Sequence, residues 1–176
     1  MALLTRKNTI SIERVFQGQI LNLRVDVLQH PNGHVTDREV VEHPGGVVIA
    51  CQPAPDRIIL IRQYRYPVDE EILELPAGRL EAGESPLLAA QRELAEETGY
   101  RAENWKELSR MYSAPGFCDE ILYLYRATGI SFVGASPDED EEIEVLDLPL
   151  IEFWKLVADG KIRDAKTIAG IGLLQI

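Results

Sequence analysis

The stretch formed by residues 78–100, GRLEAGESPLLAAQRELAEETGY, constrains this chain more than any other. Ser85 followed by Pro86 is typical of a helix N-terminus, because a serine oxygen caps free backbone N–H groups and proline fits the first turn. Gly99 is placed where a glycine commonly ends a helix. The stretch therefore predicts a loop followed by a helix that begins at Pro86.

Three glutamates share one face of this predicted helix. Glu93, Glu96 and Glu97 stand at positions i, i+3 and i+4, about one turn apart. Carboxylates at that spacing repel one another, and a bound hard cation such as Mg²⁺ or Mn²⁺ removes the penalty. A solvated acidic helix face is the alternative that the three glutamates alone leave open. The apolar residues expected to face inward are Leu87, Leu88, Ala90, Leu94 and Ala95.

The full spacing of the stretch matches a known motif. Its fixed residues are separated by five, seven, one and one positions, and they are Gly78, Glu84, Arg92-Glu93-Leu94, Glu96-Glu97 and Gly99-Tyr100. This pattern resembles the Nudix box at every fixed position, with Tyr100 standing where an aliphatic residue is common. The resemblance implies an α/β/α sandwich, with a mixed sheet flanked by helices. It also implies a metal-dependent hydrolase that cleaves the pyrophosphate of a nucleoside diphosphate linked to another group.

The resemblance also assigns roles within the box. In proteins with this motif, helix glutamates and the carbonyl of the residue before the box glycine bind divalent cations, here Mg²⁺ with Mn²⁺ as the alternative. The implied metal ligands are Ala77, Glu93 and Glu97, with Glu96 as a further ligand or as a group that orients the attacking water. The implied structural residues are Gly78, Glu84, Arg92 and Gly99. We expect an ion pair between Glu84 and Arg92 to fix the loop against the helix, and a direct catalytic role is the alternative.

Three features outside the box resemble the ADP-ribose pyrophosphatase branch of that family. They are residues 62–67 (RQYRYP) leading to 74–78 (ELPAG), Pro115 sixteen positions after Gly99, and residues 38–45 (REVVEHPG). The branch implies substrate contacts from Arg38, Arg62, Arg65, Gly116 and Phe117. A surface strand position for Arg62 and a core position for Phe117 are the alternatives. The branch often keeps its general base in the acidic loop, here Glu139 or Glu142, with Glu96 and Glu97 as the other candidates.

The leading expectation is hydrolysis of ADP-ribose to AMP and ribose 5-phosphate. A different nucleoside diphosphate sugar, or a broad range of ADP-sugars, is an alternative within the same chemistry. A third interpretation is a non-catalytic module that senses such a nucleotide. The intact set of repelling glutamates argues against it.

Composition limits the partners. The net charge of −11 argues against nucleic-acid or membrane binding, including the processing of messenger-RNA ends, because no basic patch stands out to neutralise phosphates. Cys51 and Cys118 are far apart, form no metal-binding spacing and are expected to be free thiols. No signal peptide and no membrane-spanning apolar run is recognisable, so a cytoplasmic location is expected.

The rest of the chain predicts strands mixed with helices. Residues 1–45 are interpreted as an extension with an antiparallel strand pair, 19–29 and 36–42, that forms a homodimer. Residues 46–176 are interpreted as the hydrolase domain, the whole making one structural domain. Its expected strands are 46–51, 57–64, 105–112, 121–127 and 143–148, and its further helices are 151–158 and 164–174.

Overall fold

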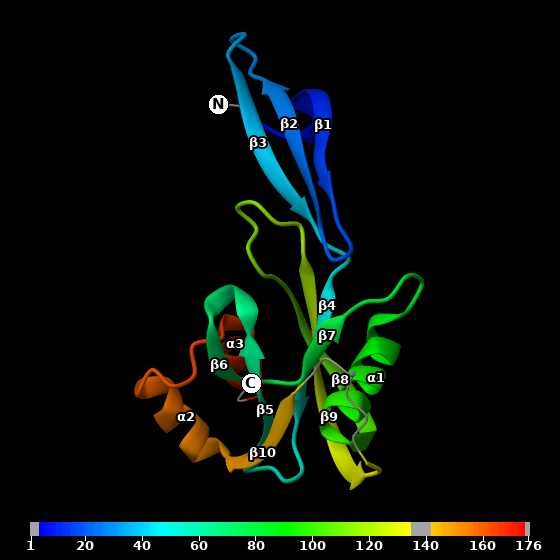
Figure 1. Cartoon of the computed structure of the whole chain (residues 1–176), viewed down its shortest axis with the longest axis vertical. Helices are drawn as coiled ribbons and strands as arrows, with labels where there is room; N and C mark the ends of the chain where they lie inside the picture. The colour runs from blue at the N-terminus through cyan, green and yellow to red at the C-terminus, as the bar shows by residue number, and fades with distance from the viewer. Residues whose placement is uncertain (1–3, 135–141, 175–176) are drawn as a thin grey trace. The chain divides into compact units, whose positions relative to one another are not determined.

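The structure is a computed structural model that describes residues 4–134 and 142–174. In chain order the described elements are η1 (Arg6–Asn8), β1 (Thr9–Gln17), β2 (Asn22–Gln29), β3 (Val35–Glu42), β4 (Gly46–Cys51), β5 (Arg57–Arg65), η2 (Tyr66–Val68), β6 (Glu70–Glu74), β7 (Ala77–Arg79), α1 (Pro86–Thr98), β8 (Tyr100–Tyr112), β9 (Ile121–Phe132), β10 (Ile143–Pro149), α2 (Leu150–Ala158) and α3 (Ala165–Leu173) (Figure 1). No helix in the described part of the chain combines the length and the apolar character that crossing a membrane requires.

The chain divides into two compact units. Unit 1 comprises Met1–Gly45 and Tyr112–Ile121, and unit 2 comprises Gly46–Met111 and Leu122–Ile176. The loop between β8 and β9, which the sequence analysis assigned to residues 46–176, is thus part of unit 1. Each unit is described by itself below.

Strand β4 is the centre of unit 2. All six of its residues are buried, which fits its continuous apolar sequence GVVIAC, because a strand covered on both faces needs no polar residue. It lies in a four-stranded sheet of order β7-β4-β9-β8, antiparallel to β7 and parallel to β9. A second, antiparallel sheet has the order β10-β5-β6. The sequence predicted β4 with its observed bounds and β5 to within one residue.

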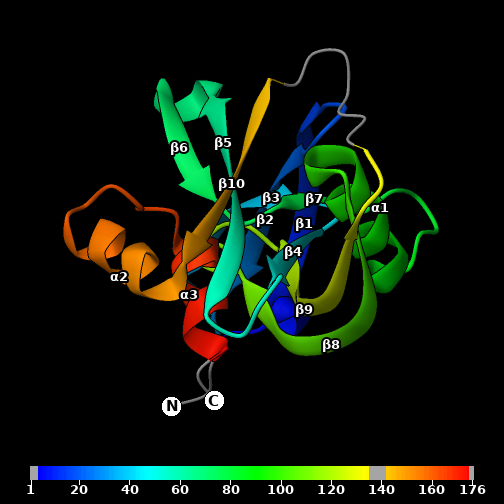
Figure 2. The same ribbon diagram turned by 90° about the horizontal axis from the view of Figure 1, so that it is seen from below.

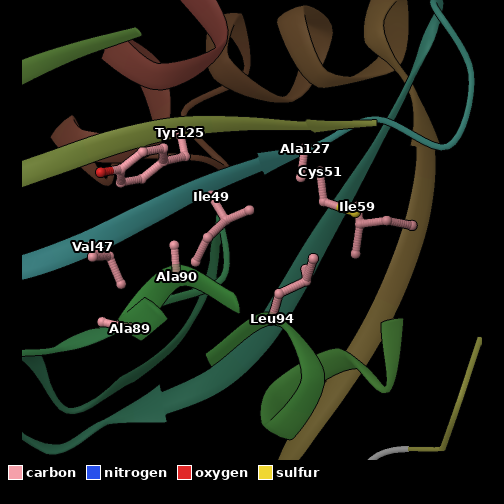
Figure 3. Packing of buried hydrophobic residues seen from close by; sticks show 9 residues of the cluster. All are labelled: Val47, Ile49, Cys51, Ile59, Ala89, Ala90, Leu94, Tyr125 and Ala127. Carbon is pink, nitrogen blue, oxygen red and sulfur yellow. The ribbon is translucent and has the colours of Figure 1, made fainter. Parts of the chain in front are cut away.

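Helices cover both faces of β4. Val47 and Ile49 pack with Ala90 of α1, whereas the alternate residues Val48 and Ala50 belong to a cluster built from α2 and α3. Figure 3 shows the α1 side, where the β4, β9 and α1 side chains point toward one another. Figure 2 shows α1 and α3 on opposite sides of β4. The expected α/β/α sandwich with a mixed sheet is confirmed.

Part of the prediction about the inward face of α1 was wrong. Leu87 and Leu88 are 38% and 58% exposed, whereas Ala89, Ala90 and Leu94 are fully buried. Both leucines lie in the first turn of the helix, where their side chains stay partly exposed. Small alanines instead allow the helix to approach the sheet closely. Ala90 and Leu94 were predicted correctly and Ala95 is half-buried, so the error is confined to the first turn.

Unit 1 contains an antiparallel sheet of order β1-β2-β3. The sequence predicted the pairing of β2 with β3, but it did not identify β1. Residues of β1 show an apolar alternation that is interrupted where the register with β2 shifts between Arg14 and Phe16. The loop 112–121 attaches to β3 through hydrogen bonds from Val41 N to Phe117 O (2.7 Å) and from Asp119 N to Val41 O (3.1 Å).

Candidate active site

Both ends of α1 are fixed by their own sequence. The Ser85 hydroxyl accepts a hydrogen bond from the backbone N of Leu88 at 3.4 Å, and Pro86 occupies the first helical position. Gly99 ends the helix with φ +71°, a left-handed conformation that a residue with a Cβ atom adopts only with strain. Both predicted helix ends are confirmed.

Helix α1 carries Glu97 into the interior of unit 2, where it is 4% exposed. The carboxylate Oε2 accepts a hydrogen bond from the backbone N of Ala77 at 3.0 Å, which ties the helix to β7. Ala77 also carries the main-chain carbonyl expected to bind metal. Two of the expected metal ligands, one from a helix and one from a strand, are therefore neighbours.

Gly78 makes room for a second carboxylate. A Cβ atom at this position would lie 1.8 Å from Glu93 Cδ and 1.9 and 2.3 Å from the two carboxylate oxygens. Gly78 is not among the residues with positive φ, so its backbone conformation does not require glycine. The close approach of Glu93 does require it.

Arg92 connects the loop to the helix carboxylates. Its Nε and Nη2 atoms donate to the two carboxylate oxygens of Glu84 at 3.0 and 2.9 Å, so the expected ion pair is present. Its Nη1 atom lies 2.8 Å from Glu93 and 3.0 Å from Glu96. The hydrogen bond from Arg92 is the largest cause that lowers the pKa of Glu84, and the same bond raises the pKa of Arg92.

These contacts also describe how the three glutamates are arranged. Glu93 and Glu96 turn toward Arg92, while Glu97 turns toward the backbone N of Ala77. Among residues 4–134 and 142–174, no three His, Cys, Asp or Glu side chains are grouped closely enough to hold a metal ion. The donor set still fits a hard divalent cation, because it offers carboxylates from one helical turn beside a main-chain carbonyl and a glycine cradle.

Two arginines of β5 were expected to bind substrate, and each has an acidic partner. Arg62 Nη1 lies 2.6 Å from Glu144 on β10, and its side chain is 40% exposed. Arg65 Nε donates to Glu74 at 2.7 Å. Burial opposes the charge of Arg65, but the hydrogen bond to Glu74 and the nearby negative charges, Glu97 among them, raise its pKa above the ordinary value. Arg65 therefore lies within electrostatic reach of a box carboxylate.

Three expected substrate-binding residues belong to unit 1. Arg38 is exposed on β3 and donates to the Thr36 hydroxyl at 3.0 Å and to the Asp37 carbonyl at 2.7 Å. Gly116 has open space where a Cβ atom would be. Phe117 is 59% exposed, so the alternative that it is a core residue is wrong.

Of the two candidate bases in the acidic loop, the structure describes Glu142 but not Glu139. Glu139 lies outside the described residues. Glu142 directly precedes β10 and is exposed. Its role, like that of Glu96 and Glu97 as alternative bases, stays a prediction.

Comparison with known proteins identifies the family. A model of the NUDIX domain matches residues 42–170. The chain belongs to the Nudix family. It is 40% identical over 178 residues to the "Methanol dehydrogenase activator" of Bacillus methanolicus, covering 100% of this chain and 96% of that protein. It is also 40% identical over 172 residues to the "ADP-ribose pyrophosphatase" of Bacillus subtilis (strain 168), covering 97% of this chain and 93% of that one.

A solved structure supports the fold. The "Crystal structure of ADP compounds hydrolase" superimposes with a TM-score of 0.84 over 95% of this chain and 91% of that chain, at 24% sequence identity. At that identity the likeness concerns the Nudix fold alone.

Two charged residues beside this Nudix site, Glu74 and Lys166, were not predicted from the sequence. Glu74, the last residue of β6, is fully buried and forms ion pairs with Arg65 and with Lys166 of α3. One signal was available, because a glutamate stood between the apolar residues of the segment EILELPAG. No sequence signal indicated Lys166, which is 92 positions away in the chain.

Proposed function

We propose that this protein hydrolyses the pyrophosphate bond of ADP-ribose and releases AMP and ribose 5-phosphate. The observation that carries the proposal is the complete Nudix box, in which α1, β7 and the preceding loop bring Glu93, Glu97 and Ala77 together. The 40% identity to an ADP-ribose pyrophosphatase over nearly the full length supports the choice of substrate.

Nudix hydrolases are in general dependent on divalent metal ions, and we propose Mg²⁺ here, with Mn²⁺ as a substitute. The residues that would hold the ion are Glu93, Glu96, Glu97 and the carbonyl oxygen of Ala77. When bound, the ion neutralises the anionic diphosphate and polarises its phosphorus toward an attacking water molecule. Arg92 bridges Glu84, Glu93 and Glu96 and so keeps two of the carboxylates oriented along the helix.

Other side chains of this chain orient the substrate and accept the proton. Arg65 presents a guanidinium beside the box, and its fork of N–H groups suits a phosphate oxygen pair. Arg62 and Arg38 are further candidates for the diphosphate and the adenine, and Gly116 with Phe117 for the terminal ribose. A carboxylate within reach of the attacking water is required as general base, and Glu139, Glu142, Glu96 and Glu97 are the candidates.

A second candidate function has one specific observation in its favour. The Bacillus methanolicus relative, named as an activator of methanol dehydrogenase, is also 40% identical and is covered over 96% of its length. By this second proposal, the chain would activate a methanol dehydrogenase. Adding the purified chain to a methanol dehydrogenase assay tests it, and an unchanged rate would exclude it. Another nucleoside diphosphate sugar as substrate stays an alternative within the same chemistry.

We further propose a homodimer formed through residues 1–45, with each site drawing on both chains. Exposed apolar side chains of unit 1 support it, among them Ile10, Ile12 and Phe16 at 55–60% exposure. Nucleic acid and membranes are not expected as partners. A cytoplasmic location is proposed, and the free thiols of Cys51 and Cys118 are consistent with it. A monomer with full activity at nanomolar concentration would contradict the dimer.

The substrate is tested by comparing kcat/KM values in the presence of Mg²⁺. The panel comprises ADP-ribose, ADP-glucose, GDP-mannose, a diadenosine polyphosphate and NADH. ADP-ribose is expected to give the highest value. Preference for another sugar nucleotide would leave the box chemistry in place and overturn only the assigned substrate. Binding without hydrolysis of any of them would favour a nucleotide-sensing module.

A further inference from the structure

The carboxylate of Glu74 sits between two cations in the interior of unit 2. It is 0% exposed, and its Oε1 atom accepts a hydrogen bond from Arg65 Nε at 2.7 Å. Its Oε2 atom is paired with the ammonium group of Lys166. Lys166 also lies 3.0 Å from Asp164, the N-cap residue of α3. Each oxygen of the buried carboxylate thus holds a cation from a different element.

Such an arrangement is not explained by stability. Taking a carboxylate and its partners out of water carries a desolvation penalty that the ion pairs often only offset, so an apolar residue of similar volume commonly serves the fold as well. The neighbouring residue Leu75 is fully buried and makes the apolar contacts of this region, within the cluster of α2 and α3. The charge at Glu74 therefore calls for a different explanation.

The geometry of Arg65 supplies one. Within the described residues, Arg65 donates one hydrogen bond, from Nε to Glu74, and none from its terminal nitrogens Nη1 and Nη2. Its side chain is 39% exposed. A guanidinium held at Nε is fixed in direction, and its two terminal nitrogens are left to donate in parallel to another group. Planar double donation of this kind suits a phosphate.

The direction matters because of what lies beside Arg65. The negative charge of Glu97, a box carboxylate, contributes to the raised pKa of Arg65, so the two groups are electrostatic neighbours. Lys166 neutralises the second oxygen of Glu74 and so keeps that carboxylate from attracting the rest of the guanidinium. An anionic ligand of the box thus meets an arginine whose orientation is already set.

We propose that Glu74 is a positioning residue for the substrate diphosphate, acting through Arg65, with Lys166 holding Glu74 in place. This inference rests on the proposed binding of a diphosphate by Arg65. It assigns to Glu74 no contact with the substrate. Its contribution is the orientation of one guanidinium before the ligand arrives, which reduces the freedom that binding must remove.

A double-mutant cycle on ligand affinity tests the proposal. The probe is the non-hydrolysable α,β-methylene analogue of ADP-ribose, titrated calorimetrically in the presence of Mg²⁺, so that no turnover is needed. Glu74→Gln is expected to weaken binding about tenfold or more, and Arg65→Ala by at least as much. In the Arg65→Ala background, Glu74→Gln is expected to change the affinity less than about twofold, because its effect passes through Arg65. Equal effects in both backgrounds would overturn the proposal.

Matched variants keep the test independent of folding. Glu107→Gln makes the same chemical change in the exposed ion pair with Arg110 and is expected to leave affinity unchanged. If Glu74→Gln does not fold, Arg65→Lys replaces it in the test. A lysine can still pair with Glu74, but it has no planar pair of terminal N–H donors for a phosphate. Arg65→Lys is then expected to bind as weakly as Arg65→Ala, and near wild-type affinity would overturn the proposal.

The outcome also separates this inference from the proposed function. Wild-type protein that binds the analogue but does not cleave ADP-ribose would contradict the proposed function, while the cycle still measures the coupling of Glu74 to Arg65. Wild-type protein that does not bind the analogue would overturn the positioning role itself, because Arg65 would then have no diphosphate to receive.

Discussion

Replacing Gly78 with alanine separates the architecture of the box from its chemistry. The new Cβ atom would lie 1.8 Å from Glu93 Cδ, whereas ordinary van der Waals contact begins at 3.4 Å. The carboxylate must therefore withdraw by 3.4 − 1.8 = 1.6 Å. The obstacle is the far end of a flexible side chain, so Glu93 can move without displacing the backbone of β7 or α1.

The cost in stability is expected to be small. Gly78 has no positive φ, so alanine fits its backbone conformation, and the substitution gains about 0.4–1 kcal/mol by restricting the unfolded chain. An off-rotamer Glu93 costs about 0.5–1.5 kcal/mol. The two terms nearly cancel, and the free energy of unfolding should change by less than about 1 kcal/mol.

The cost in activity is expected to be large. A displacement of about 1 Å in a catalytic group can lower a rate about 100-fold, and Glu93 must move farther than that. Gly78→Ala should therefore lower kcat/KM for ADP-ribose by roughly 100-fold or more. The assay is initial-rate hydrolysis with Mg²⁺, paired with chemical denaturation of the same preparation.

A second glycine provides the control. Gly172 in α3 has open space where a Cβ atom would be and no positive φ, so Gly172→Ala should retain full activity with equal or greater stability. If Gly78→Ala instead kept kcat/KM within about threefold of wild type, the assignment of Glu93 to the metal site would be refuted.

Three further predictions concern α1, α3 and the loop before α1. Glu97→Gln keeps an oxygen that can accept the Ala77 N–H bond but removes the charge, so turnover should nearly vanish while the melting temperature changes little; largely intact activity would contradict the metal-site assignment. Gly170→Ala would place a Cβ atom 2.7 Å from Leu75 Cδ1 in the core. Denaturant titration should therefore show a free energy of unfolding lowered by about 1–3 kcal/mol. The lowered pKa of Glu84 means that its pairing with Arg92 stabilises the fold above the ordinary glutamate pKa of 4.5 and less as the pH falls below it. Glu84→Gln should therefore flatten the decline of melting temperature between roughly pH 5 and 3, and an unchanged profile would contradict the assigned pair.

The elements predicted from sequence are those whose signals are local. Strand β4 is a short apolar run between turn residues, and α1 carries a capping serine, a first-turn proline and a terminal glycine, so each could be read without knowledge of the fold. The Asp164 side chain likewise caps α3 by accepting from Thr167 N, as its position indicated. Local signals of this kind depend on a few neighbouring residues.

The elements and contacts that were missed depend on distant partners. Strand β1 exists through its pairing with β2, and a register shift breaks the alternation that would have identified it. The exposure of Leu88 depends on which side of α1 meets β4. Glu74 and Lys166 are brought together by the packing of α3, so no spacing in the sequence could indicate their contact.

The central claim is that the box of this chain cleaves the bond between the two phosphates of ADP-ribose with the help of a divalent ion. The most direct measurement is chromatographic identification of the products formed from ADP-ribose with Mg²⁺, without metal, and with Glu97→Gln. The account predicts AMP and ribose 5-phosphate in equal amounts from the wild-type protein with Mg²⁺ only. Products from any other bond, or equal turnover without metal, would contradict it.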